Sequence, residues 1–156
     1  GIYGNFGQVN YGAAKAAMIG LMNCLHIEGA KYDIRVNTLA PTAATRMTAG
    51  LISEESAALL GPETVTPAVL YLVGENAPSR MIMGAGAGVF AVTRISESEG
   101  VFLPEEERTP AGIARRIDEI ACQEKGRPLT DAFDQMTKFA DIAARALNAT
   151  TTGTNR

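Results

Sequence analysis

The sequence predicts an α/β fold built on a parallel β-sheet, and two patterns carry this prediction. A helical pattern over residues 8–29 is followed by a short polar turn and a strand-like run over residues 34–40. A second helical segment, residues 62–75, precedes a short strand at residues 81–83. A helix followed by a turn and a strand is half of a βαβ unit, and repeated units of this kind form a parallel sheet.

The first helix presents a wide apolar surface. Asn10 is a candidate N-cap, and Gly29 is a candidate end of the helix. Small and flexible side chains let a neighbour approach closely, and either the sheet or a second subunit fits that description. The apolar positions are Ala13, Ala14, Ala16, Ala17, Met18, Leu21, Met22 and Leu25.

The strand over residues 34–40 alternates branched and polar side chains, and Pro41 ends it. Residues 41–62 then form a loop and a short helix that opens near Ser53. The helix over residues 62–75 carries Pro67 in its first turn, where proline is tolerated.

The glycine-rich segment 84–88 follows the strand at residues 81–83. Alternating glycines superficially resemble a phosphate-binding loop, but no amphipathic helix opens directly after them. We therefore interpret the segment as a turn at the end of the sheet. Residues 89–95 and 101–103 are candidates for further strands.

The composition changes at Pro104, where a charged stretch begins. Residues 110–122 have helical spacing, whereas residues 133–147 are less regular. The threonine-rich end is expected to be disordered. The predicted organisation is residues 1–103 as the sheet domain, 104–149 as a helical extension and 150–156 as a disordered tail.

Bulk properties exclude several classes of protein. The net charge of −3 gives no general attraction to nucleic acid or to an anionic membrane. No apolar run approaches the length of about 18 residues that a membrane span needs. Cys24 and Cys122 lack the spacing of a zinc site, and we expect reduced thiols and no bound metal. His26, the one histidine, is expected on a helix surface or at a subunit contact.

Tyr11 and Lys15 are the first candidates for chemistry. Positions i and i+4 of a helix lie on one face, with Cβ atoms about 5–6 Å apart. An ammonium group close to a phenol favours the phenolate, which suits proton transfer during carbonyl reduction or alcohol oxidation. A tyrosine and a lysine at this spacing are also common as plain surface residues, so the pair alone does not decide the function.

The surrounding sequence resembles the short-chain dehydrogenase/reductase family. Three segments in the family's order carry the resemblance: GIYGNFGQVNYGAAK at residues 1–15, IRVNTLAP at residues 34–41 and MIMGAG at residues 81–86. Within the family, the segment APTAATRMT at residues 40–48 is most similar to the (3R)-hydroxyacyl-CoA dehydrogenase group. Most members have glycine where this chain has Thr42, and Arg46 stands where many have threonine.

The resemblance implies a Rossmann-type doubly wound parallel sheet, of which this chain carries the C-terminal half with a C-terminal extension. It implies that Tyr11 is the proton donor and acceptor, and that Lys15 assists it and binds the nicotinamide ribose. The implied cofactor is NAD or NADP. Besides this catalytic pair, which also contacts the cofactor, the implied cofactor-binding residues are Pro41, Thr42, Ala43, Ala44 and Thr45. Residues 46–60 would form a lid over the substrate.

The resemblance also implies partners and missing parts. The expected substrate is an acyl-CoA or another carbonyl or alcohol, and a homodimer or tetramer is expected through helix 9–29. The family's serine and glycine-rich dinucleotide turn would precede Gly1. The alternatives are a ketone or alcohol reductase with another substrate, or an inactive fragment that lacks the cofactor-binding half. The cytoplasm is the expected compartment, with the peroxisome as the alternative.

Overall fold

The computed structural model describes residues 1–48 and 50–153, with side chains up to residue 149. It contains two compact units, the first spanning Gly1–Thr93 and the second beginning at Arg94. The sequence predicted this boundary after residue 103. Residues 94–103 belong to the second unit because Glu97 pairs there with Arg127 and Lys138.

The first unit is built on a three-stranded sheet in the order β1 (Thr38–Pro41), β2 (Ile82–Gly86) and β3 (Val89–Thr93). β1 and β2 are parallel, with Thr38 opposite Ile82, which confirms the α/β class with parallel strands. β3 returns antiparallel to β2 through a two-residue turn, a connection that can join only antiparallel strands. The turn residues Ala87 and Gly88 both have positive φ, as a hairpin turn of this length requires.

The predicted glycine turn is therefore shorter than expected. Residues 84–86 lie inside β2, and the chain reverses only at Ala87 and Gly88. Glycine in a strand often marks a close approach of another backbone. At Gly86 that backbone is the segment after β1, as described below.

Helix α1 (Val9–Gly29) agrees with the predicted helix and its end at Gly29. The predicted cap is wrong: Gln8 occupies the N-cap position, and Asn10 lies in the first turn, where its side-chain oxygen accepts a hydrogen bond from the Tyr11 N–H. A 3₁₀ turn, η1 (Ala30–Tyr32), follows, and Asp33 in the left-handed conformation (φ 55°) redirects the chain.

Strand β1 begins at Thr38, later than the predicted Ile34. The preceding backbone is held by side chains instead of a strand partner. The Val36 N–H donates to Ser79 Oγ, and the Asn37 amide donates to the carbonyls of Leu72 and Pro78. These tertiary contacts fix residues 36 and 37 where the alternating pattern alone suggested a strand.

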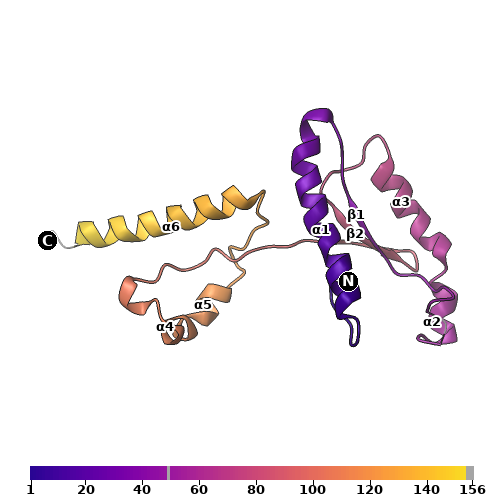
Figure 1. The fold of residues 1–156 in the computed structure, drawn as a ribbon, viewed down its shortest axis with the longest axis horizontal. Coiled ribbons are helices and arrows are strands. Elements are labelled where there is room, and N and C mark those ends of the chain that lie inside the picture. The colour runs from indigo at the N-terminus through magenta and orange to yellow at the C-terminus, as the bar shows by residue number, and fades with distance from the viewer. Residues whose placement is uncertain (49, 154–156) are drawn as a thin grey trace. The chain divides into compact units, whose positions relative to one another are not determined.

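The core of the first unit lies between β2 and the helical layer of η2 (Pro62–Val65) and α3 (Thr66–Val73). The buried side chains of this layer and of the strand are Val65, Ala68, Leu72, Met83 and Ala85. Helix α1 and helix α3 lie on opposite sides of β1 and β2 (Figure 1). On the α1 side, Met22 is buried and its sulfur accepts a hydrogen bond from Thr38 Oγ1.

The second unit contains η3 (Glu105–Glu107), α4 (Pro110–Arg115), α5 (Ile117–Ala121) and the long helix α6 (Ala132–Gly153). The sequence predicted one helix where α4 and α5 are separated at Arg116, whose φ of −106° is not helical. Helix α6 continues through residues 150–153, which were expected to be disordered, and residues 154–156 of that predicted tail lie outside the described residues.

Candidate active site

Tyr11 and Lys15 lie together on the first turns of α1. The Lys15 Nζ atom is 5.7 Å from the centre of the Tyr11 ring, so both side chains point to the same side of the helix. The Tyr11 side chain is half exposed. Among the described residues, no carboxylate lies within ion-pair distance of Lys15, which leaves its charge available to the phenol. A phenol next to an unneutralised ammonium can exchange a proton with a substrate oxygen.

The second part of the site is the segment that follows β1. The Thr42 N–H donates to the Ala85 carbonyl at 2.8 Å, and the Ala44 N–H donates to the Leu60 carbonyl at 2.7 Å. A Cβ atom on Gly86 would lie 2.4 Å from the Thr42 carbonyl oxygen, which is closer than any side chain tolerates. The backbone of residues 42–44 is therefore fixed between the end of β2 and the end of α2 (Glu54–Leu59).

The start of the predicted lid is an ordered turn. Thr45 and Thr48 bond each other reciprocally: the Thr45 N–H donates to Thr48 Oγ1, and the Thr48 hydroxyl donates to the Thr45 carbonyl. A cavity of about 370 Å³ lies beside this turn and helix α2. Its wall includes Ala44, Thr45, Thr48, Gly50, Ile52, Glu54 and Ala57. Of the segment 41–45, Ala44 and Thr45 thus border a hollow that could receive part of a ligand.

Both groups of expected site residues belong to the first unit, but they do not bond each other. No hydrogen bond or ion pair within the described ranges 1–48 and 50–153 connects Tyr11 or Lys15 to residues 41–45. Sequence reasoning missed the roles of Gly86 and Leu60, which hold the backbone of residues 42–44 in place. The alternation of glycines in residues 84–88 was the available signal for Gly86.

The other candidate residues are His26 and the two cysteines. His26 Nδ1 is 2.8 Å from Ser79 Oγ, so the histidine connects α1 to the segment before β2. Cys24 and Cys122 are both free and exposed. Within the described residues, no group of three or more histidine, cysteine or acidic side chains could hold a metal ion. No helix of that part of the chain is long and apolar enough to cross a membrane.

Comparison with known proteins agrees with this architecture. Residues 1–56 match the family model of the short chain dehydrogenases. The chain belongs to the short-chain dehydrogenase/reductase family, a class of oxidoreductases. It is 39% identical over 150 residues, 94% of its length, to the peroxisomal hydratase-dehydrogenase-epimerase of Saccharomyces cerevisiae. It is also 39% identical over 123 residues, 77% of its length, to the peroxisomal multifunctional enzyme type 2 of Mus musculus.

A solved structure, that of full-length peroxisomal multifunctional enzyme type 2 from Drosophila melanogaster, matches with a TM-score of 0.79 and 26% identity. The match covers 92% of this chain, so it includes most of the second unit as well as the sheet. It covers 27% of the fly chain, and the chain spans 17% of each of the yeast and mouse relatives.

Proposed function

We propose that this chain carries the proton-transfer and nicotinamide-facing part of an NAD- or NADP-dependent oxidoreductase that interconverts (3R)-3-hydroxyacyl-CoA and 3-ketoacyl-CoA. The observation that carries the proposal is the Tyr11–Lys15 pair, with Nζ 5.7 Å from the ring centre on a half-exposed face of α1. The name of the yeast relative, which includes a dehydrogenase, supports the type of reaction. The choice of substrate is supported by a similarity to the acetoacetyl-CoA reductase of an Acinetobacter species, which is 41% identical over 86 residues.

The residues present fit a nicotinamide group. The backbone of residues 42–44 is fixed by β2 and α2, Tyr11 and Lys15 offer a hydroxyl and an ammonium, and neither bears a carboxylate partner in the part of the chain that the structure describes. A nicotinamide cofactor would supply or take up the hydride. Tyr11 would give a proton to the substrate oxygen during reduction and remove it during oxidation. Lys15 would stabilise the ionised phenol between these steps and bind the ribose.

Tyr11→Phe tests the proposal. In the protein as it is naturally produced, turnover of acetoacetyl-CoA with NADH or NADPH should fall by about 10²-fold or more, because the general acid is lost. Cofactor affinity, followed by nicotinamide fluorescence, should stay within about twofold of wild type, since the phenol hydroxyl supplies few of the cofactor contacts. Lys15→Ala should reduce both turnover and cofactor affinity.

Tyr32→Phe is the matched control, because Lys31 Nζ lies 4.8 Å from the centre of the exposed Tyr32 ring. This variant removes a phenol beside an ammonium outside the site and should keep full turnover. Wild-type turnover in Tyr11→Phe would refute the assignment. Faster turnover of a ketone without CoA would favour the broader reductase. Absence of any nicotinamide fluorescence response in the chain itself would favour an inactive fragment.

Association of two or four copies through residues 9–29 is part of the proposal. Helix α1 exposes Met18, Leu21 and Leu25 on one side, and a second copy of the helix would cover these apolar side chains. Light scattering of the purified protein measures this association. The proposed compartment is the cytoplasm, with the peroxisome as the alternative. The names of the yeast and mouse relatives favour the peroxisome.

A further inference from the structure

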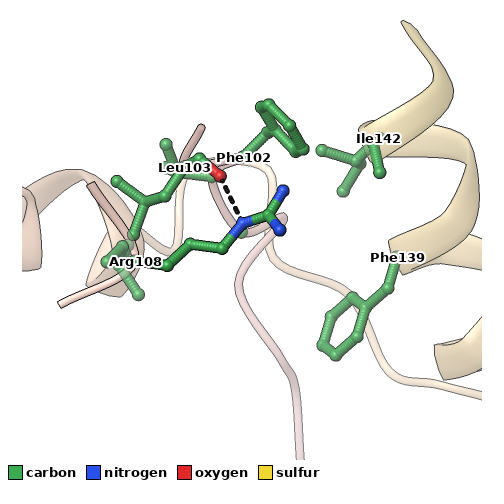
Figure 2. A pocket seen from close by; sticks show the side chains of 9 residues that line it. Phe102, Leu103, Arg108, Phe139 and Ile142 are labelled. Carbon is green, nitrogen blue, oxygen red and sulfur yellow. Dashed lines mark hydrogen bonds between the residues drawn. The ribbon is translucent and has the colours of Figure 1, made fainter. Parts of the chain in front are cut away.

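The second unit contains an apolar pocket whose lining includes neither Tyr11 nor Lys15. Its volume is about 480 Å³, within the range of about 300–1,000 Å³ that is usual for small-molecule sites. The walls come from residues 100–103, from α5 and from α6 (Figure 2). The large apolar side chains among them are Val101, Phe102, Leu103, Ile120, Phe139 and Ile142.

These side chains surround a hollow and do not fill it. Phe139 is 52% exposed, and no hydrophobic side chain of the second unit is buried among the residues that the structure describes. Contacts outside the walls hold them in place: Lys138, beside Phe139 on α6, donates to Glu97 Oε1 and to the Ser98 carbonyl, the latter at 2.7 Å. Covering such walls with an apolar chain gains about 25 cal/mol for each Å² removed from water.

Among the residues that the structure describes, Arg108 is the one charged residue that lines this pocket. Its Nε donates to the Leu103 carbonyl at 2.9 Å, and its guanidinium carbon lies 5.5 Å from the centre of the Phe102 ring. Figure 2 shows the guanidinium end directed toward the side of the pocket formed by Phe102 and Ile142.

The charge of Arg108 is not neutralised by a neighbour. No carboxylate of the described residues lies within ion-pair distance of its guanidinium, and the adjacent Glu107 pairs with Arg116 at 3.8 Å. The two Nη groups have no acceptor within that same part of the chain. They form the planar fork that binds a carboxylate through two parallel hydrogen bonds.

We propose that this pocket binds a molecule with one apolar chain and a terminal carboxylate, which is the chemistry of a fatty acid. The chain would lie against Phe102, Phe139 and Ile142, and the carboxylate would pair with Arg108. All residues that line the pocket belong to the second unit, whereas Tyr11 and Lys15 belong to the first. Binding at this site is inferred independently of the proposed reaction.

Isothermal titration calorimetry of the whole chain with decanoate and with decanol tests the site. Decanoate should bind with one site per chain and tighter than decanol, because only the acid engages the guanidinium. Arg108→Gln should weaken decanoate binding by about tenfold, as expected for losing a charged hydrogen-bond partner, and leave decanol binding unchanged. Phe139→Ser should weaken the binding of both.

Arg115→Gln is the matched control, since Arg115 ends α4 and does not line the pocket. Equal losses in Arg115→Gln and Arg108→Gln, equal affinities for decanoate and decanol, or no heat with decanoate would overturn the proposal. If circular dichroism shows that Arg108→Gln does not fold, the wild-type chain offers a second measurement. High salt should then reduce the affinity for decanoate and not that for decanol, and equal salt dependence would contradict the site.

Discussion

Replacing Gly86 by alanine should disturb both the fold and the site, because the new methyl group has no room. Its Cβ would lie 2.4 Å from the Thr42 carbonyl oxygen and 3.0 Å from the Thr42 Cβ atom. The nearest obstacle is backbone, so the strand ends must separate and stretch the hydrogen bond from the Thr42 N–H to the Ala85 carbonyl. Overpacking of this kind costs about 1–3 kcal/mol of the free energy of unfolding.

Gly84→Ala provides the comparison within the same strand. A Cβ on Gly84 would lie 3.8 Å from the Ala91 carbonyl oxygen and 3.9 Å from the Ala40 carbonyl oxygen, which is ordinary contact. Because glycine loses more backbone entropy than alanine on folding, Gly84→Ala should be neutral or stabilise by up to about 1 kcal/mol. Each variant adds one methyl group to the wild-type chain, and the two positions are two residues apart in β2.

Urea unfolding followed by tyrosine fluorescence measures the difference. All four tyrosines lie in the first unit and the chain has no tryptophan, so the signal reports on the sheet and its helices. With a urea dependence of about 1–3 kcal/mol per M, a loss of about 2 kcal/mol lowers the midpoint by about 1 M in Gly86→Ala. Equal midpoints for Gly86→Ala and Gly84→Ala would refute the view that Gly86 fixes the segment after β1.

Two further predictions concern the core and the second unit. Leu72→Ala should lower the free energy of unfolding by about 2–4 kcal/mol because Leu72 is 8% exposed in the core, whereas Leu70→Ala, at 64% exposure on the same helix, should cost under about 1 kcal/mol in the same urea assay. The Arg127 guanidinium and the Thr130 N–H hold the pKa of Asp134 below its usual range. A lowered pKa contributes stability that is present above the unfolded value and lost as the pH falls, so the stability advantage of wild type over Asp134→Asn should shrink below about pH 4. Helix unfolding followed at 222 nm checks this, and a difference that stays constant with pH would contradict it.

The sequence was informative where local spacing determines geometry. The four-residue interval between Tyr11 and Lys15 put both on one helix face, and the structure has Nζ beside the ring. The end of α1 at Gly29 was likewise readable, because glycine commonly ends a helix. In the structure, a Cβ at this position would lie 2.9 Å from the Ile34 Cβ atom. Local spacing was enough to place Tyr11 and Lys15 on one face, but it did not by itself decide their function.

Features set by distant residues were not readable. The late start of β1 depends on Asn37, whose amide reaches carbonyls of residues 72 and 78. The boundary of the second unit depends on Glu97, which pairs with Lys138 far along the chain. The sequence predicted Gly86 as part of a turn because its close neighbour, the Thr42 backbone, belongs to the segment after β1, far away in the sequence. Side chains at such separations meet only after the chain has folded.

The two exposed thiols have a practical consequence, because Cys24 lies on α1 of the first unit and Cys122 follows α5 of the second. Each unit therefore already carries a single attachment point for a maleimide dye, with no engineered cysteine required. A donor and an acceptor fluorophore on these sulfurs would convert the separation of the units into a transfer efficiency in solution. Titrating NADH or decanoate into the labelled protein would then report, in one cuvette, whether either ligand rearranges the units.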